Sequence, residues 1–209
     1  MLVLPRSVQA QEQIIYELKL AGMRVTSLNC DDLSSIDGVS GTAKFDPESK
    51  TLTLDNATIS TSVIKFPGLE NSIKGLTIRL IGDNTITSEN YWGLFNNTER
   101  SITFTGSGKL TVNGSTTAPQ TGYRRAIFNW GTIVVDGCTL EANGGVYGIG
   151  SGFWKFVNCN VRTKGGGGSQ SDEYAGSLTW MWDKEPEFVG CKITSPAGVS
   201  WKKFQNNGY

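Results

Sequence analysis

Aromatic side chains are the residues of this chain whose types and spacing point most clearly to a binding chemistry. The chain has six tryptophans, and two of them, Trp180 and Trp182, would share one face of a strand. Sugar rings stack on flat aromatic faces, so exposed aromatic rings in a row predict a glycan-binding surface. The candidate glycan-binding residues are Tyr91, Trp92, Trp130, Trp180 and Trp182. The alternative is that these rings fill the protein interior or cover its corners.

Carboxylates give less support for catalysis. A polysaccharide lyase needs clustered carboxylates for calcium, and a glycoside hydrolase needs two carboxylates that face each other across the sugar. The densest acidic set, Asp183, Glu185 and Glu187, is interpreted as a solvated loop. Asp136 and Glu141 flank one turn, where aspartate usually bonds to the backbone. Nothing distinguishes a lyase base among Arg124, Arg125, Arg162 and Lys164. We therefore predict no catalytic residue.

The composition argues against several other kinds of site and partner. The chain has no histidine, which removes the commonest general base and the commonest zinc ligand. Its four cysteines show no CxxC spacing, so neither a metal site nor a cofactor is predicted, and calcium has no recognisable site. Lys+Arg and Asp+Glu are both 19, and without a basic stripe we expect no nucleic-acid partner. No apolar run is long enough to span a membrane. The oligomeric state is not predicted.

Six segments share one pattern and must supply the strands that position these side chains. Each has alternating apolar residues, then an Asn or Gly turn, then a second alternating run, a pattern that predicts strand, corner, strand. A third short strand is predicted between segments, at 94–96, 126–129, 146–149 and 177–180. Three strands per repeat, at irregular spacing, predict a solenoid. The six segments are 51–60, 76–88, 101–113, 131–143, 153–164 and 186–195.

Aligned on their turns, four segments predict stacked interior columns. Leu54, Val135, Phe156 and Phe188 precede the turn, and Asn56, Gly137, Asn158 and Gly190 occupy it. Ala57, Cys138, Cys159 and Cys191 follow, and Cys30 has no visible partner. Equivalent residues of neighbouring coils lie about 4.8 Å apart. The cysteine column is therefore interpreted as buried free thiols, with a Cys138–Cys159 disulfide as the alternative.

The first fifty residues differ from the repeats. Two hairpins are expected there, one turning at Ala21-Gly22 and one through the stretch 46–50, where proline takes a favoured turn position. A solenoid must cover its open end, so residues 14–50 are assigned as a β cap and 51–200 as the solenoid. Residues 1–13 are interpreted as a tail or the remnant of an export signal, and 201–209 as a C-terminal tail.

The stretches TLTLDNATIS, GLTIRLIGDNTITS, GCKITSPAG and DPESKTLTL carry a resemblance to a family. They resemble the β-helix domains of predicted surface proteins of Gram-negative anaerobic gut-type bacteria, with the architecture of the pectate-lyase-like superfamily. The resemblance covers residues 14–200. It implies an all-β, single-stranded right-handed parallel β-helix with an N-terminal β-hairpin cap. Some related domains bind acidic polysaccharide, with or without calcium, but no functional residue is carried over, because the matching positions are turns and core.

These observations lead to one expected function and two alternatives. We expect a secreted or cell-surface bacterial module that binds polysaccharide through exposed aromatic residues and is not a catalyst. The first alternative is a structural or adhesive stalk that binds a protein partner. The second is a polysaccharide lyase or glycoside hydrolase.

Overall fold

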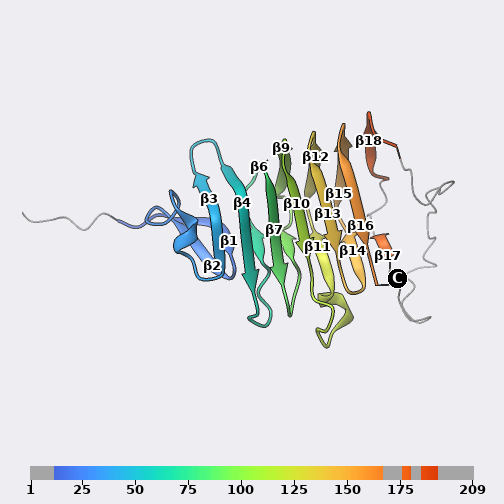
Figure 1. Ribbon diagram of the computed structural model, residues 1–209, viewed down its shortest axis with the longest axis horizontal. Coiled ribbons are helices and arrows are strands. Elements are labelled where there is room, and N and C mark those ends of the chain that lie inside the picture. Colours follow the sequence, from blue (N-terminus) through green and yellow to red (C-terminus); the bar gives the residue numbers. More distant parts are fainter. Residues whose placement is uncertain (1–11, 167–175, 180–184, 193–209) are drawn as a thin grey trace, which may run out of the picture.

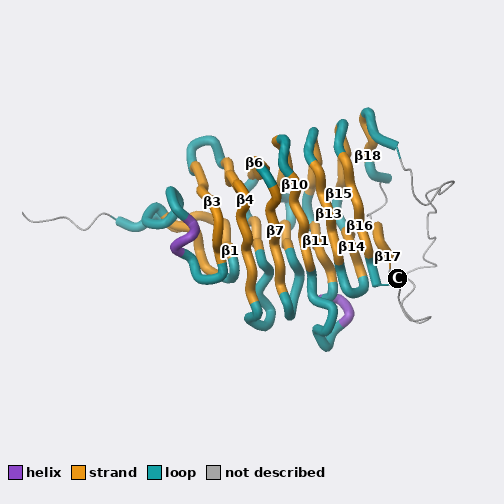
Figure 2. Tube along the Cα trace, viewed as in Figure 1, coloured by secondary structure: helices purple, strands orange, loops and turns teal. Residues whose placement is uncertain are grey.

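The computed structural model describes residues 12–166, 176–179 and 185–192. The chain is all-β and solenoid-like. The strands run across the long axis of the molecule and are stacked side by side along it, so that successive coils follow one another from the N-terminal end (Figure 1). Loops gather at the ends of the strands (Figure 2). Two short 3-10 helices, η1 (Leu33–Ser35) and η2 (Thr121–Tyr123), interrupt this pattern. No helix among the described residues is long and apolar enough to cross a membrane.

The third strand of each coil belongs to a sheet of its own, here called sheet A. Its parallel strands are β5 (Leu69–Asn71), β8 (Leu94–Asn96), β11 (Arg125–Asn129), β14 (Tyr147–Gly150) and β17 (Gly176–Thr179). These elements confirm the third strand predicted between the repeats. At the N-terminal end, β1 (Ile15–Leu20) pairs antiparallel to β5, and β2 (Met23–Thr26) pairs with β1. Ala21 and Gly22 make the predicted tight turn, both with positive φ.

The strands before and after each corner form two further ladders. The ladder before the corner contains β4 (Thr51–Thr61), β6 (Leu76–Ile81), β9 (Ser101–Gly106), β12 (Thr132–Asp136), β15 (Phe153–Val157) and β18 (Glu187–Val189). The ladder after the corner contains the second half of β4, then β7 (Asp83–Ser88), β10 (Lys109–Asn113), β13 (Thr139–Asn143) and β16 (Asn160–Lys164). The hairpin predicted through 46–50 is confirmed, with β3 (Val39–Asp46) antiparallel to β4.

The corners confirm one expectation and correct another. Asn56, Gly137, Asn158 and Gly190 all take positive φ, as the turn pattern predicts. Leu54, however, does not lie in the column of Val135. That column contains Leu52, Ile78, Phe104, Val135, Phe156 and Phe188.

The physical reason is that the corner itself moves along the ladder. Asn56 lies four residues after Leu52, whereas Gly137 lies two residues after Val135. A shift of two residues keeps every apolar side chain on the same face of a strand, so the alternation does not reveal it. The same shift removes Ala57 from the cysteine column. The backbone N–H of Ala57 instead donates to the side-chain oxygen of Asn84 over 2.9 Å.

The interior is apolar except for a few buried polar side chains. Leu, Ile, Val and Phe from all three ladders pack into one core that runs from β1 to β15. Asn71, Asn96 and Asn129, on β5, β8 and β11, lie in this interior with no exposed surface. At the last described rung, Phe188 stacks on Phe156 with ring centroids 5.3 Å apart but is 37 % exposed. The expectation that Phe188 is core is therefore met only on the side that faces Phe156.

Candidate functional site

Three of the five candidate binding residues lie on the outer side of sheet A. Tyr91 and Trp92 are in ring contact, and Trp130 joins them through Phe128, because β8 and β11 are paired in register. We call the six rings that gather there the aromatic cluster: Tyr91, Trp92, Phe95, Tyr123, Phe128 and Trp130. The other two candidates, Trp180 and Trp182, lie outside the described residues.

Trp92 lies at the centre of the aromatic cluster. Its ring centroid is 4.1 Å from that of Tyr91, 4.9 Å from that of Phe95 and 4.6 Å from that of Phe128. The interplanar angles are 37°, 42° and 63°, so the rings are tilted against one another and do not form one flat platform. Phe128 is buried, and the other five rings are partly exposed. The cluster thus combines rings that pack against each other with side chains that keep part of their surface exposed.

Hydrogen bonds from the loop before β11 hold the central ring in place. The Trp92 indole Nε1–H donates to the carbonyl oxygen of Gly122 over 2.8 Å. The N–H of Ser115 donates to the carbonyl oxygen of Tyr91 over 2.9 Å, and Arg124 Nε donates to the carbonyl oxygen of Ala118 over 2.7 Å. The indole N–H is therefore occupied by a backbone hydrogen bond, so a ligand would have to contact Trp92 through its ring carbons.

One cation and one phenol give the aromatic cluster its electrostatic character. The guanidinium carbon of Arg125 lies 4.3 Å from the ring centroid of Phe128 and 4.6 Å from that of Tyr147, within cation–π range. Burial lowers the pKa of the Arg125 guanidinium. Burial, together with Tyr123 and the carboxylate of Glu70, raises the pKa of Tyr91 to about 12. The Tyr91 phenol therefore keeps its proton and remains a hydrogen-bond donor at neutral pH.

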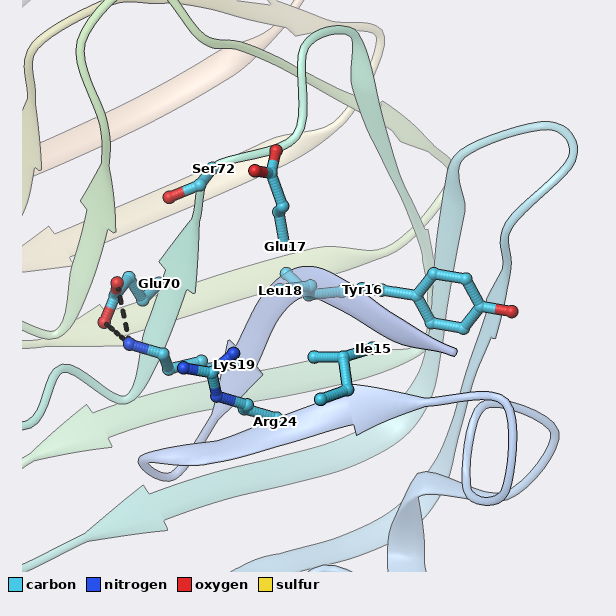
Figure 3. Close-up of a pocket in the computed structure, with 8 residues that line it drawn as sticks. All are labelled: Ile15, Tyr16, Glu17, Leu18, Lys19, Arg24, Glu70 and Ser72. Atoms are coloured by element: carbon cyan, nitrogen blue, oxygen red, sulfur yellow. Dashed lines mark hydrogen bonds and ion pairs between the residues drawn. The ribbon is translucent and has the colours of Figure 1, made fainter. Parts of the chain in front are cut away.

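A pocket of about 300 Å³ lies beside β1, β2 and β5. Figure 3 shows the Lys19 ammonium against the Glu70 carboxylate, with Arg24 beside them. Lys19 Nζ lies 3.0 and 3.1 Å from the two carboxylate oxygens of Glu70. The pocket is lined by Ile15, Tyr16, Glu17, Leu18, Lys19, Arg24, Glu70 and Ser72.

Strand pairing connects this pocket to the aromatic cluster. Lys19 pairs with Glu70, Glu70 with Phe95, and Phe95 with Phe128. The residues next to these along their strands are buried, so this row lies on the outer face of sheet A; they include Leu18, Asn71 and Asn96. The two features therefore belong to one continuous surface.

The residues considered for catalysis do not come together. Glu141 is paired with Lys109 and Glu187 with Lys155, at 3.0 and 3.2 Å, and Asp136 is exposed. Among the residues that the structure describes, no three His, Cys, Asp or Glu side chains form a group that could hold a metal ion. Asp183 lies outside the described residues.

The cysteines are free thiols, and the closest described approach differs from the expected one. Cys159 Sγ lies 3.7 Å from Cys191 Sγ, one coil further along, so the candidate pair is not Cys138–Cys159. Cys30 and Cys138 are buried, in keeping with the interpretation as small apolar groups. Cys159 and Cys191 are only partly buried.

The candidate binding residues did not include Phe95, Tyr123 and Phe128, which also belong to the aromatic cluster; of these, Tyr123 stood out by residue type, and the two phenylalanines did not. The available signal was the third-strand pattern itself, because LFN at 94–96 and IFN at 127–129 place a phenylalanine at the same position of two neighbouring coils. Trp154 does not belong to the cluster: it is buried in β15, with its indole N–H bonded to the carbonyl oxygen of Ser151.

Comparison with known proteins gives no relative to set beside this site: no family model, no curated protein and no solved structure matches the chain.

Proposed function

We propose that this protein is a non-catalytic module that binds polysaccharide on the outer face of sheet A. The observation that carries the proposal is the aromatic cluster, where partly exposed rings surround Trp92. Aromatic faces bury the C–H faces of sugars, and the neighbouring polar groups of Glu70, Lys19 and Ser72 can bond to sugar hydroxyls.

The proposal extends to the finer architecture and to the location of the protein. Parallel strands with three per coil support a single-stranded parallel β-helix, and its right-handed sense follows from the handedness of parallel crossover connections. The hairpins β1–β2 and β3–β4 support an N-terminal cap. Together with the resemblance to bacterial β-helix surface domains, this supports a secreted or cell-surface location.

Tryptophan fluorescence during titration with neutral and acidic polysaccharides, with and without calcium, tests the function. We expect a saturable change with at least one polysaccharide, because Trp92 would lose contact with water. Trp92→Ala should weaken that binding at least about tenfold, since it removes the central ring.

Two further variants separate binding from folding. Trp92→Phe keeps a ring at the centre of the aromatic cluster and should retain most of the affinity. Trp154→Phe changes a tryptophan buried in the core, away from sheet A, and should leave binding unchanged. If the folded wild-type chain binds none of the polysaccharides, the proposed function is wrong.

A second candidate function is favoured by the tilt of the rings. Because Trp92 packs against four neighbouring rings and bonds to Gly122, the aromatic cluster also suits a rigid stalk that presents this face to a protein partner. Absence of glycan binding by the folded chain would favour this adhesive stalk.

A further inference from the structure

The outer face of sheet A changes from aromatic to polar side chains along one row of paired residues. Phe95 and Phe128 form its aromatic end, and Glu70 and Lys19 form its polar end. Neighbouring strands are about 4.8 Å apart, so the row from Lys19 to Phe128 spans about 14 Å. This length exceeds a single sugar ring and suits several sugar units of an extended chain that crosses the strands.

A second row runs beside the first. Ser72, after β5, accepts a hydrogen bond at its Oγ from the Asn97 side-chain amide over 3.2 Å, and Trp130 donates its backbone N–H to the Asn96 carbonyl oxygen over 2.8 Å. This row therefore also has hydroxyl and amide groups at its polar end, and Trp130 of the aromatic cluster at its other end. The change from polar to aromatic side chains is thus shared by two neighbouring rows.

We propose that an uncharged polysaccharide chain lies along this face, with two sugar units on the aromatic cluster, over Phe128 and Phe95, and the next unit bonded to the carboxylate of Glu70. This inference rests on the proposed function and adds the Glu70 subsite and the class of ligand. Lys19 holds the Glu70 carboxylate with two short contacts. A carboxylate fixed in this way accepts hydrogen bonds from sugar hydroxyls.

Charge argues for an uncharged chain. The lining of the pocket at the polar end has two cations, Lys19 and Arg24, and two anions, Glu17 and Glu70, so this lining has no net charge to attract an acidic sugar. A further cation, Arg100, is bonded through its Nε–H to the carbonyl oxygen of Ser72 over 2.6 Å.

Along the row, the first ionisable group outside the aromatic cluster is Glu70, the direct strand neighbour of Phe95. The Arg125 guanidinium beside the cluster is already stacked on the rings of Phe128 and Tyr147. A uronate carboxylate on the sugar next to the aromatic cluster would be repelled by Glu70.

The test compares short and long oligomers on the intact chain. The probes are a disaccharide and a longer oligomer of each of glucose, xylose and mannose, with oligogalacturonate as the acidic probe. We expect a longer neutral oligomer to bind more tightly than its disaccharide and more tightly than oligogalacturonate. Glu70→Gln should weaken the longer oligomer about tenfold and leave the disaccharide unchanged, because only the longer ligand reaches Glu70.

The chain offers a matched control. Lys109 and Glu141 form a second cross-strand ion pair at 3.0 Å, of similar exposure, away from sheet A. Glu141→Gln removes the same kind of ion pair, so it should affect stability as much as Glu70→Gln does. The Glu141→Gln variant should nevertheless bind both oligomers with unchanged affinity.

Three results would overturn the inference. If Trp92→Ala abolishes binding but Glu70→Gln changes the affinity for neither oligomer, the aromatic site is supported and the proposed Glu70 subsite is wrong. If oligogalacturonate binds most tightly, the ligand class is wrong. Failure of the wild-type chain to bind any probe would overturn this inference and the proposed function together.

Discussion

The side-chain amide of Asn96 donates a hydrogen bond of 2.8 Å to the side-chain oxygen of Asn129, one coil further along. Asn71 makes the same bond of 2.8 Å to Asn96, so three buried amides form a continuous ladder through the interior. The Asn96 amide also donates to the carbonyl oxygen of Arg100, at the turn after β8. This ladder satisfies polar groups of three successive coils in a place that water cannot reach.

Replacing Asn96 with alanine should therefore destabilise the protein strongly. The substitution leaves the Arg100 carbonyl oxygen without this donor and removes both amide–amide bonds. We expect the free energy of unfolding to fall by about 3 kcal/mol. Urea denaturation followed by circular dichroism measures this change.

Asn143→Ala is the matched control. Asn143 donates to the side-chain oxygen of Asn113 over 3.1 Å in a similar rung, but both residues are only partly buried. Water can replace that bond, so the loss should stay below about 1 kcal/mol. Equal losses for Asn96→Ala and Asn143→Ala would contradict a special role for the buried ladder.

The fold was predictable to the extent that it depends on local pattern. Alternation and corner residues such as Asn56 and Gly137 located the coils, because they are needed wherever the chain bends. The register between coils was not predictable, because pairing Leu54 or Leu52 with the next coil buries the same face. Long-range pairing selects between these two registers, and the alternation of apolar residues does not indicate which of them forms.

The candidate site was predictable only in part for the same reason. Trp92 and Trp130 stood out by residue type, but their proximity depends on the pairing of β8 with β11. Glu70 and Lys19 were not recognised, because β1 and β5 pair antiparallel across 51 residues of sequence. No local pattern marks such a contact.

A glycine directly after β10, beside the start of β11, should not tolerate a side chain. A Cβ atom added at Gly114 would overlap the carbonyl oxygen of Arg125, which belongs to the backbone of β11 and cannot move freely. We expect Gly114→Ala to lower the free energy of unfolding by about 3 kcal/mol. Thermal unfolding measures the effect.

Gly122→Ala is the comparison, because a Cβ there meets no atom within 4 Å. It should change stability by less than about 1 kcal/mol. If Gly114→Ala leaves stability unchanged, the backbone around the start of β11 can shift to make room for the added Cβ atom.

Mild oxidation should join Cys159 to Cys191. The two sulfur atoms are 3.7 Å apart, and a disulfide reagent such as oxidised glutathione can accept the two electrons by thiol–disulfide exchange. We expect peptide mapping by mass spectrometry to find a Cys159–Cys191 cross-link, with no Cys138–Cys159 product. Cys191→Ser should abolish the cross-link, and a dominant Cys138–Cys159 product would contradict this pairing.

Alkaline pH should destabilise the protein through Cys138. Burial raises the pKa of its thiol from 9.0 to about 11. Between these two values the unfolded chain has released the proton while the folded chain still holds it, so the free energy of unfolding falls as the pH rises. Well below the lower value the thiol is protonated in both states, and its contribution is constant. Melting temperatures measured by circular dichroism across this alkaline range should show the decline.

Cys138→Ala separates this thiol from the other titrating groups. The variant has no proton to release at this position, so its melting temperature should fall less steeply than that of the wild type between the two pKa values. Cys159, whose pKa burial raises to about 12, still titrates in the variant, so a smaller decline remains. Parallel curves for the two proteins would show that the Cys138 thiol ionises as readily in the folded chain as in the unfolded one.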